Sequence, residues 1–171
     1  MQLGESFVGI GSEAAHLNTV LGNRRGQVGQ AWTTALATPR EGHASFVVVA
    51  RPNVPVLPMT LFVNKATIAG ADHARLTWGA AQLGVASGVL DAVHQGSIDE
   101  SQVHELCIIA AVWVDPAASD EDLVYENNRA ATRRALRHGA LREPEIEEVM
   151  AFRDEPLNGY YVPPTLRSNG N

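Results

Sequence analysis

Two pairs of polar side chains interrupt segments that are otherwise apolar. His16 and Asn18 are two positions apart in the segment Ala15–Gly22, and Lys65 and Thr67 are two apart in a later apolar segment. Successive side chains of a β-strand point to opposite faces, so each pair would present two polar groups from one rigid backbone. Histidine exchanges protons near neutral pH, and the other three groups can bind a polar molecule. This arrangement suits a binding or catalytic site.

Gln82 is a further candidate, because it interrupts the small-residue segment Trp78–Gly88. Each candidate also has a purely structural explanation. A strand histidine often only fills a hydrogen-bonding position, and a strand asparagine often lies at the surface. A lysine stem can carry its ammonium group to water, and a helical glutamine is often solvated. Spacing alone leaves both explanations open.

Sequence motifs of several other site types are absent. The chain lacks the phosphate-binding loop GxxxxGK(S/T), the dinucleotide pattern GxGxxG, the nucleophile elbow GxSxG, and the patterns CxxC and HExxH. The histidines show no metal-ligand spacing, so we predict a site without a metal. They are His16, His43, His73, His94, His104 and His138.

The composition is typical of a globular protein that does not bind nucleic acid. The 171 residues suit one domain, expected over residues 1–171, and 45% of them are hydrophobic. A net charge of −6 and a pI of about 5.4 leave no basic stripe that would displace phosphate counterions. The one basic cluster, Arg133–His138, is interpreted as a solvated helix face.

The single cysteine and the apolar segments predict a cytoplasmic protein. Cys107 cannot form an internal disulfide. Met1–Gly11 lacks the basic region and continuous apolar stretch of a signal peptide. No apolar run reaches the roughly 18 residues that a membrane span requires, so we expect no membrane partner.

Hydrophobic periodicity predicts four strands and three helices. Period-two alternation and continuous β-branched runs indicate strands, while apolar residues three and four apart indicate helices. The strands are expected at Ala15–Gly22, Ala44–Ala50, Thr60–Ile68 and Leu106–Val114. The helices are expected at Gln27–Ala37, Ala71–Val93 and about Ser119–His138. The order of these elements predicts an α+β fold, a layered sheet with helices packed on one face.

Glycine and proline positions add details to this prediction. Pro52–Pro58 holds three prolines and is expected to be an ordered loop. Gly84 and Gly88 would let a neighbouring element approach the second helix closely. Gly139 is expected to end the third helix. The tail is mixed, with Asn158–Pro164 extended or rich in turns.

Two long segments carry specific sequence motifs. Gly4–Gly26 reads GESFVGIGSEAAHLNTVLGNRRG. It is similar to GExxVGxGxExAHxDxxxGxRxG, a pattern of the formaldehyde-activating enzyme family. Gly42–Ile68 reads GHASFVVVARPNVPVLPMTLFVNKATI and is similar to G(H/F)xS, an apolar strand, PN(V/L)P and PxTLxxNKxTI. Gly79–Ala86 and Asn128–Thr132 are similar to GPAQxxVA and NYEAT. The similarity ends near residue 144, after which the tail diverges.

The resemblance implies a fold like the second domain of ribosomal protein S5 and a homopentameric ring with pterin sites between subunits. It also implies an activity: condensation of formaldehyde with tetrahydromethanopterin, a co-substrate, to methylene-tetrahydromethanopterin without a metal. His16 falls on the histidine proposed as proton donor, a role that suits its chemistry. The positions that line or contact the pterin match Asn18, Val47, Lys65, Thr67 and Gln82.

Several positions depart from the family pattern. Asn18 replaces an aspartate, which removes a charge beside His16 but keeps hydrogen-bonding capacity. Ala80 replaces the proline of GPAQ, and Asn127 and Arg129 stand where tyrosines are common. These departures indicate a paralogue. Two alternatives therefore stay open: a non-catalytic carrier or sensor that binds pterin or formaldehyde, and the same condensation on a different amine or folate-type acceptor.

Overall fold

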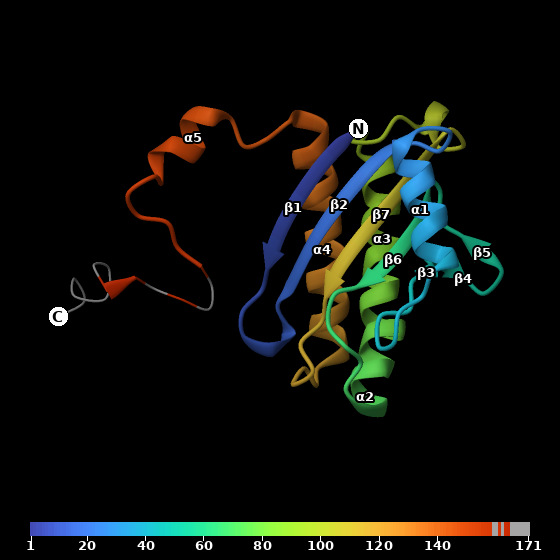
Figure 1. Ribbon diagram of the computed structural model, residues 1–171, viewed down its shortest axis with the longest axis horizontal. Coiled ribbons are helices and arrows are strands. Elements are labelled where there is room, and N and C mark those ends of the chain that lie inside the picture. Colours follow the sequence, from blue (N-terminus) through green and yellow to red (C-terminus); the bar gives the residue numbers. More distant parts are fainter. Residues whose placement is uncertain (159–160, 162, 165–171) are drawn as a thin grey trace.

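The computed structural model describes residues 1–158, 161 and 163–164, and its centre is a five-stranded sheet (Figure 1). The strand order is β1-β2-β7-β6-β3, in which only the β6–β7 pair is parallel among the described residues. Its strands are β1 Gln2–Val8, β2 Ala15–Asn23, β3 Phe46–Val47, β6 Met59–Asn64 and β7 Leu106–Trp113. A separate hairpin pairs β4 Val49–Arg51 with β5 Val54–Pro55.

The sheet packs against helices, which confirms the predicted layered α+β fold (Figure 1). Helices lie on both of its faces. The long helices α3 and α4 pack against each other and cover one face, while α1 lies over one end of the other face. The prediction of helices on one face only is therefore wrong. The helices are α1 Gln27–Ala37, α2 Gly70–Arg75, α3 Gln82–His94, α4 Glu121–Leu141 and α5 Ile146–Ala151. A π-helical stretch, Leu76–Ala81, joins α2 to α3, and 3-10 turns lie at Gly11–Glu13 and Glu100–Gln102.

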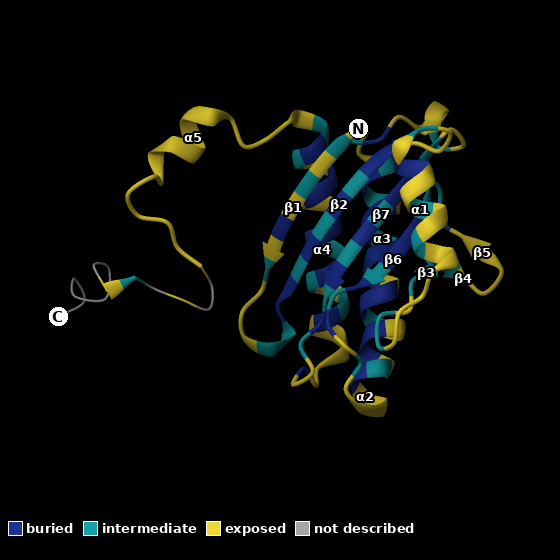
Figure 2. Cartoon of the chain, in the orientation of Figure 1, coloured by how far each residue is buried: buried dark blue, intermediate teal, exposed yellow. Residues whose placement is uncertain are grey.

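The side-chain alternation of β2 divides the molecule into a core face and an open face. Ala15, Leu17 and Leu21 are buried in the core with Val85 and Val89 of α3. Because neighbouring side chains on a strand point opposite ways, the residues between them lie on the face away from α3 and α4. Figure 2 shows this alternation as buried and half-buried bands along β2. Helix α1 covers only one end of that face, and the rest stays open.

Strand β1 is not among the predicted elements. Its core-facing positions include Gly4 and Ser6 rather than large apolar residues. A Cβ on Gly4 would lie 1.8 Å from the backbone oxygen of Ala135, so α4 packs directly on the strand backbone. Close packing of a helix on a strand requires small residues, and these remove the hydrophobic alternation that identifies a strand.

Two predicted strands have different bounds. The run Ala44–Ala50 is not one buried strand, because the N–H of Val48 bonds Thr60 in the sheet while the N–H of Val49 bonds the side chain of Gln82. The chain thus passes from β3 into the separate β4 hairpin. Strand β6 ends at Asn64, so the predicted strand Thr60–Ile68 is too long. The expected loop Pro52–Pro58 contains β5 but is otherwise irregular.

The helix predictions are largely confirmed. Gly84 and Gly88 allow α3 to approach α4, since a Cβ at Gly88 would lie 2.6 Å from the Thr132 Cβ. Asp120 caps α4 by accepting a hydrogen bond from the N–H of Leu123. The predicted end at Gly139 is wrong: the helix continues to Leu141, and Gly139 instead packs closely on β1.

The C-terminal segment leaves α4 and extends past β1, away from the sheet (Figure 1). Helix α5 lies in this segment and is exposed along its length (Figure 2). The predicted extended stretch Asn158–Pro164 falls partly outside the described residues, and its described part has a bridge between Asn158 and Tyr161. No helix in the described part of the chain is long and apolar enough to cross a membrane.

Candidate functional site

His16 lies on the open face of the sheet, where three strands place side chains beside one another. In the strand pairing, His16 lies opposite Phe7 of β1 on one side and Trp113 of β7 on the other. Directly paired residues of antiparallel strands share a face, so both aromatic side chains flank the imidazole. The His16 and Phe7 ring centroids are 6.1 Å apart, and the His16 side chain is 38% exposed. A partly apolar, open surface thus surrounds the histidine.

Glu5 provides a carboxylate next to this histidine. Its Oε1 lies 3.2 Å from Nε2 of His16, close enough for an ion pair when the imidazole is protonated. Glu5 is directly opposite Asn18 in the β1–β2 register. The carboxylate therefore lies next to both His16 and Asn18, the two polar residues on the open face of β2.

Lys65 joins the same group from the other side of β7. It directly follows β6, and its N–H donates to the backbone oxygen of Val112 at 2.9 Å. Its Nζ donates to Oδ1 of Asn18, also at 2.9 Å. Burial lowers the pKa of the Lys65 ammonium, while the negative charge of Glu5 opposes this shift. The structure thus brings His16, Asn18 and Lys65 together.

Thr67 lies beyond the end of β6 and contacts a different histidine. Its Oγ1 is 3.1 Å from Nε2 of His43, and Nδ1 of His43 is 3.0 Å from the backbone oxygen of Asn64. Gly42 has a φ of +71° and passes so close to Thr67 that a Cβ there would lie 2.6 Å from the Thr67 methyl group. The expectation that Lys65 and Thr67 share a strand face is therefore wrong, although only one residue separates them.

Val47 and Gln82 form a second, separate group. Gln82 begins α3 and is buried, and its Oε1 accepts a hydrogen bond from the N–H of Val49 at 2.7 Å. This bond leaves the amide nitrogen of Gln82 available to another molecule. Val47 and Gln82 line a shallow groove together with Ala44, Phe46, Val49 and Trp78.

A single chain does not bring the two groups together. Gln82 is on α3, which covers the face of the sheet opposite to His16. Strands β2 and β3 are also three steps apart in the sheet, which is about 14 Å at the usual strand spacing. Among the residues that the structure describes, no three His, Cys, Asp or Glu side chains gather as metal ligands.

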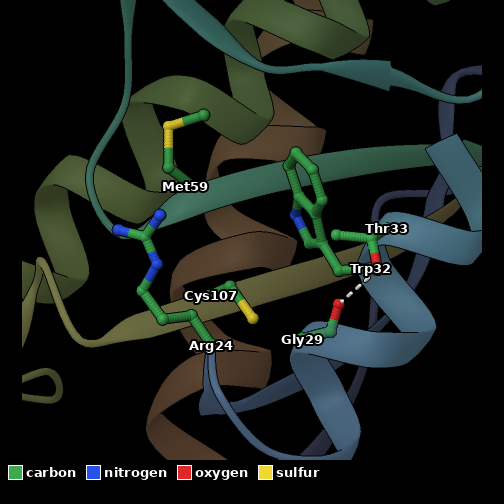
Figure 3. Close-up of a pocket in the computed structure, with 6 residues that line it drawn as sticks. All are labelled: Arg24, Gly29, Trp32, Thr33, Met59 and Cys107. Atoms are coloured by element: carbon green, nitrogen blue, oxygen red, sulfur yellow. Dashed lines mark hydrogen bonds between the residues drawn. The ribbon is translucent and has the colours of Figure 1, made fainter.

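Another pocket lies under α1 at the opposite end of β7 (Figure 3). It is lined by Arg24, Gly29, Trp32, Thr33, Met59 and Cys107. Cys107 is six residues along β7 from Trp113, or about 20 Å from the row that holds His16. Burial raises the pKa of the Cys107 thiol, which makes it a poor nucleophile. This pocket contains none of the predicted site residues.

Comparison with known proteins decides the family. A sequence model of the formaldehyde-activating enzymes matches residues 3–160, nearly the whole chain. The chain belongs to the formaldehyde-activating enzyme family. The predicted resemblance is thus confirmed, and the match includes both polar groups described above.

Named relatives in this family include a lyase that the chain nearly spans and longer bifunctional proteins. The chain is 40% identical over 152 residues to the 5,6,7,8-tetrahydromethanopterin hydro-lyase of Methanosarcina barkeri, covering 89% of this chain and 85% of the relative. It is 38% identical over 149 residues to the bifunctional enzyme Fae/Hps of Methanosarcina mazei, covering 87% of this chain. The chain spans only 38% of that bifunctional relative's length.

Two neighbours of His16, Glu5 and Trp113, are not among the site residues predicted from the sequence. Glu5 stands within the quoted segment Gly4–Gly26, but it belongs to a strand that lacked a hydrophobic pattern. Trp113 is within a predicted strand, and its Nε1 is buried without a hydrogen-bond partner among the described residues. Only the strand pairing of β1, β2 and β7 reveals that both lie beside His16.

Proposed function

We propose that this protein condenses formaldehyde with tetrahydromethanopterin to form methylene-tetrahydromethanopterin, with His16 as the general acid. Membership of the formaldehyde-activating enzyme family and 40% identity to a tetrahydromethanopterin hydro-lyase support the substrate pair. The observation that carries the assignment to a site is the cluster of His16, Asn18 and Lys65 on an open, partly aromatic face.

The chemistry of the condensation requires an acid at one step. The pterin N5 amine attacks formaldehyde and gives a hydroxymethyl adduct. A proton from His16 converts the hydroxyl group to water as the carbon–oxygen bond breaks, and the N5 lone pair forms an iminium ion. The second pterin nitrogen attacks this carbon and loses its own proton, which closes the ring. Because the condensation also proceeds unaided, the protein contributes mainly orientation and this acid.

The surface around His16 can orient a flat, polar ring system. Phe7 and Trp113 flank the histidine and offer apolar ring surfaces to a bicyclic pterin. Lys65 and Asn18 supply a donor and an amide for the polar edge of that ring. The amide nitrogen of Gln82 has no hydrogen-bond partner among the described residues and can serve the same purpose, but it lies in the second group.

The pterin positions other than Thr67 fall into two separate groups. This division favours a homo-oligomer, and we propose the pentameric ring of the family. In a ring of identical subunits each copy presents one surface to the next, so the groove of Val47 and Gln82 in one copy can complete the face of His16 in another. The pterin would then bind between neighbouring copies.

The initial rate of methylene-tetrahydromethanopterin formation tests the activity. We expect the protein to accelerate the reaction above the rate without protein, and His16→Ala to lose about 10²-fold of the acceleration, the usual contribution of a general acid. His94→Ala removes an exposed histidine at the end of α3, outside this cluster, and serves as a control that should keep the wild-type rate. A wild-type rate equal to that of the blank would contradict the proposal.

A second candidate function is non-catalytic binding of the pterin. The replacement of an acidic residue by Asn18 favours this candidate, because Lys65 then has a neutral partner while the pterin-contacting residue types remain. Saturable binding of tetrahydromethanopterin without any acceleration would select it. If formaldehyde condensed faster with another amine or a folate-type acceptor, the acceptor would be different while the chemistry stayed the same.

A further inference from the structure

Lys65 is the single lysine in the sequence. The chain holds 13 lysine and arginine residues, and all the others are arginines. Formaldehyde adds readily to a neutral primary amine, whereas a guanidinium group stays protonated and has no free lone pair. The one side chain that can form a simple amine adduct with this substrate class is therefore the one in the cluster with His16 and Asn18.

The geometry places the Lys65 amine beside a proton donor. Lys65 follows the Asn64–Val112 pair by one residue, which puts it level with Trp113, and Trp113 is paired with His16. The Nζ atom crosses β7 to reach Asn18, two residues along β2 from His16. The amine and the imidazole therefore lie on the same open face, and Asn18, which bonds Nζ, is the next residue after His16 on that face of β2.

The surroundings of Lys65 shift its titration toward the neutral, nucleophilic form. Burial lowers the pKa of its ammonium group, and Glu5 only partly opposes this effect. The partner of Nζ is the amide oxygen of Asn18, which accepts a hydrogen bond from a neutral amine as well as from an ammonium group. In the described part of the chain no carboxylate lies within ion-pair distance of Nζ. Partial desolvation is one of the effects that make Schiff-base lysines nucleophilic.

We propose that Lys65 captures formaldehyde covalently and passes its carbon to the acceptor amine. The Nζ lone pair forms a bond to the formaldehyde carbon, and proton transfer gives a hydroxymethylamine. His16 donates a proton to the hydroxyl group, which leaves as water and produces a lysine iminium ion. The acceptor amine then attacks the iminium carbon, in place of free formaldehyde, and its proton moves to Nζ. The Nζ–carbon bond breaks with its electron pair going to Nζ, which returns Lys65 as the free amine and leaves the iminium ion on the acceptor nitrogen. No oxidant or reductant is needed.

This proposal rests on the proposed function only for the identity of the acceptor, because capture itself requires no pterin. Reductive trapping can therefore test capture alone. The protein is treated with formaldehyde and cyanoborohydride without pterin, so that hydride addition converts the iminium ion to an N-methyl group. Peptide mass spectrometry then gives the methylation rate of Lys65.

A matched control is a surface lysine in the same molecule. Arg134→Lys places one on the exposed side of α4, where Arg134 makes no hydrogen bond or ion pair among the described contacts. We expect Lys65 to be methylated several-fold faster than this introduced lysine at neutral pH. Equal or slower methylation of Lys65 would overturn the proposal, because an ordinary lysine would then react as well.

Asn18→Asp provides the second test of capture. A carboxylate beside Nζ stabilises the ammonium form and should reduce the methylation rate of Lys65 several-fold while leaving the introduced surface lysine unchanged. An unchanged or higher rate at Lys65 would contradict the role given to its neutral partner.

The rate of pterin condensation distinguishes covalent capture by Lys65 from the proposed function. Lys65→Arg keeps the positive charge but removes the nucleophile, so we expect a lower kcat in the pterin assay. If the wild type turns over and Lys65→Arg keeps its kcat, covalent capture is not on the reaction path and the proposal fails. If Lys65 is trapped selectively but the wild type does not accelerate pterin condensation, the capture site stands and the proposed function fails.

Discussion

At the scale of single residues, the properties of the site arise from how charges surround one amine. Lys65 has a neutral hydrogen-bond partner in Asn18, while Glu5 borders the cluster and also contacts His16. The charge that the family pattern places at position 18 is thus absent, and the carboxylate that acts on Lys65 belongs to β1. The titration of Lys65 should therefore respond to Glu5.

Glu5→Gln tests this electrostatic arrangement. Since Glu5 raises the pKa of Lys65 against the lowering effect of burial, removing its charge should lower that pKa further. The pH profile of Lys65 modification by an amine-selective acylating reagent should then shift to lower pH. Glu126→Gln, which removes an exposed charge on α4 with no described ion pair, should leave the profile unchanged. A shift to higher pH in Glu5→Gln would contradict this account.

At the scale of elements, α3 and α4 pack closely against each other and cover the face of the sheet opposite to His16. A Cβ at Gly88 would lie 2.7 Å from the backbone oxygen of Arg129 and 2.6 Å from the Thr132 Cβ. Neither atom is the flexible end of a side chain, so the two helices must separate to accommodate it. Gly79, in the π-helical stretch before α3, has nothing within 4 Å of the corresponding position.

The substitutions Gly88→Ala and Gly79→Ala form a matched pair. Gly88→Ala should lower the free energy of unfolding by about 1–3 kcal/mol, the usual effect of overpacking. Gly79→Ala should leave it unchanged or raise it by about 0.4–1 kcal/mol, because alanine restricts the unfolded chain more than glycine. Denaturant unfolding monitored by circular dichroism measures both values. Equal effects of the two substitutions would contradict the close contact at Gly88.

At the scale of the whole molecule, the two groups of site residues are separated by the sheet. His16 lies on the open face and Gln82 on the helix that covers the other face. If neighbouring copies complete each other's sites, a defect on one surface of one copy can be compensated by another copy.

Mixing two defective variants tests this shared site. His16→Ala removes the acid, and Gln82→Glu removes the free amide donor but keeps an oxygen for the N–H of Val49. After joint refolding at equal amounts, about a quarter of the sites in a random ring would have both intact surfaces, so about a quarter of wild-type activity should return. Each variant refolded alone is the control. A mixture no more active than the average of the two would show that each chain forms its own site.

The sequence by itself determined the family and most helices, and it supplied the candidate polar residues, whose role stays a prediction. Period-two alternation placed His16 and Asn18 on one face of β2, and helical periodicity gave the bounds of α1. These are local properties, because side-chain direction along one element follows from its backbone geometry alone. The long motifs of Gly4–Gly26 and Gly42–Ile68 gave the family match before any contact was known.

Only the tertiary structure decided which of these residues meet. The Lys65–Asn18 bond joins residues 47 positions apart, and it depends on β7 inserting between β2 and β6. The place of Glu5 beside His16 could not be predicted, because β1 packs on α4 through small residues and has no hydrophobic alternation. The separation of Gln82 from His16 likewise follows from which face α3 covers. Pairing and layer order depend on contacts between distant segments, which no local pattern in the chain specifies.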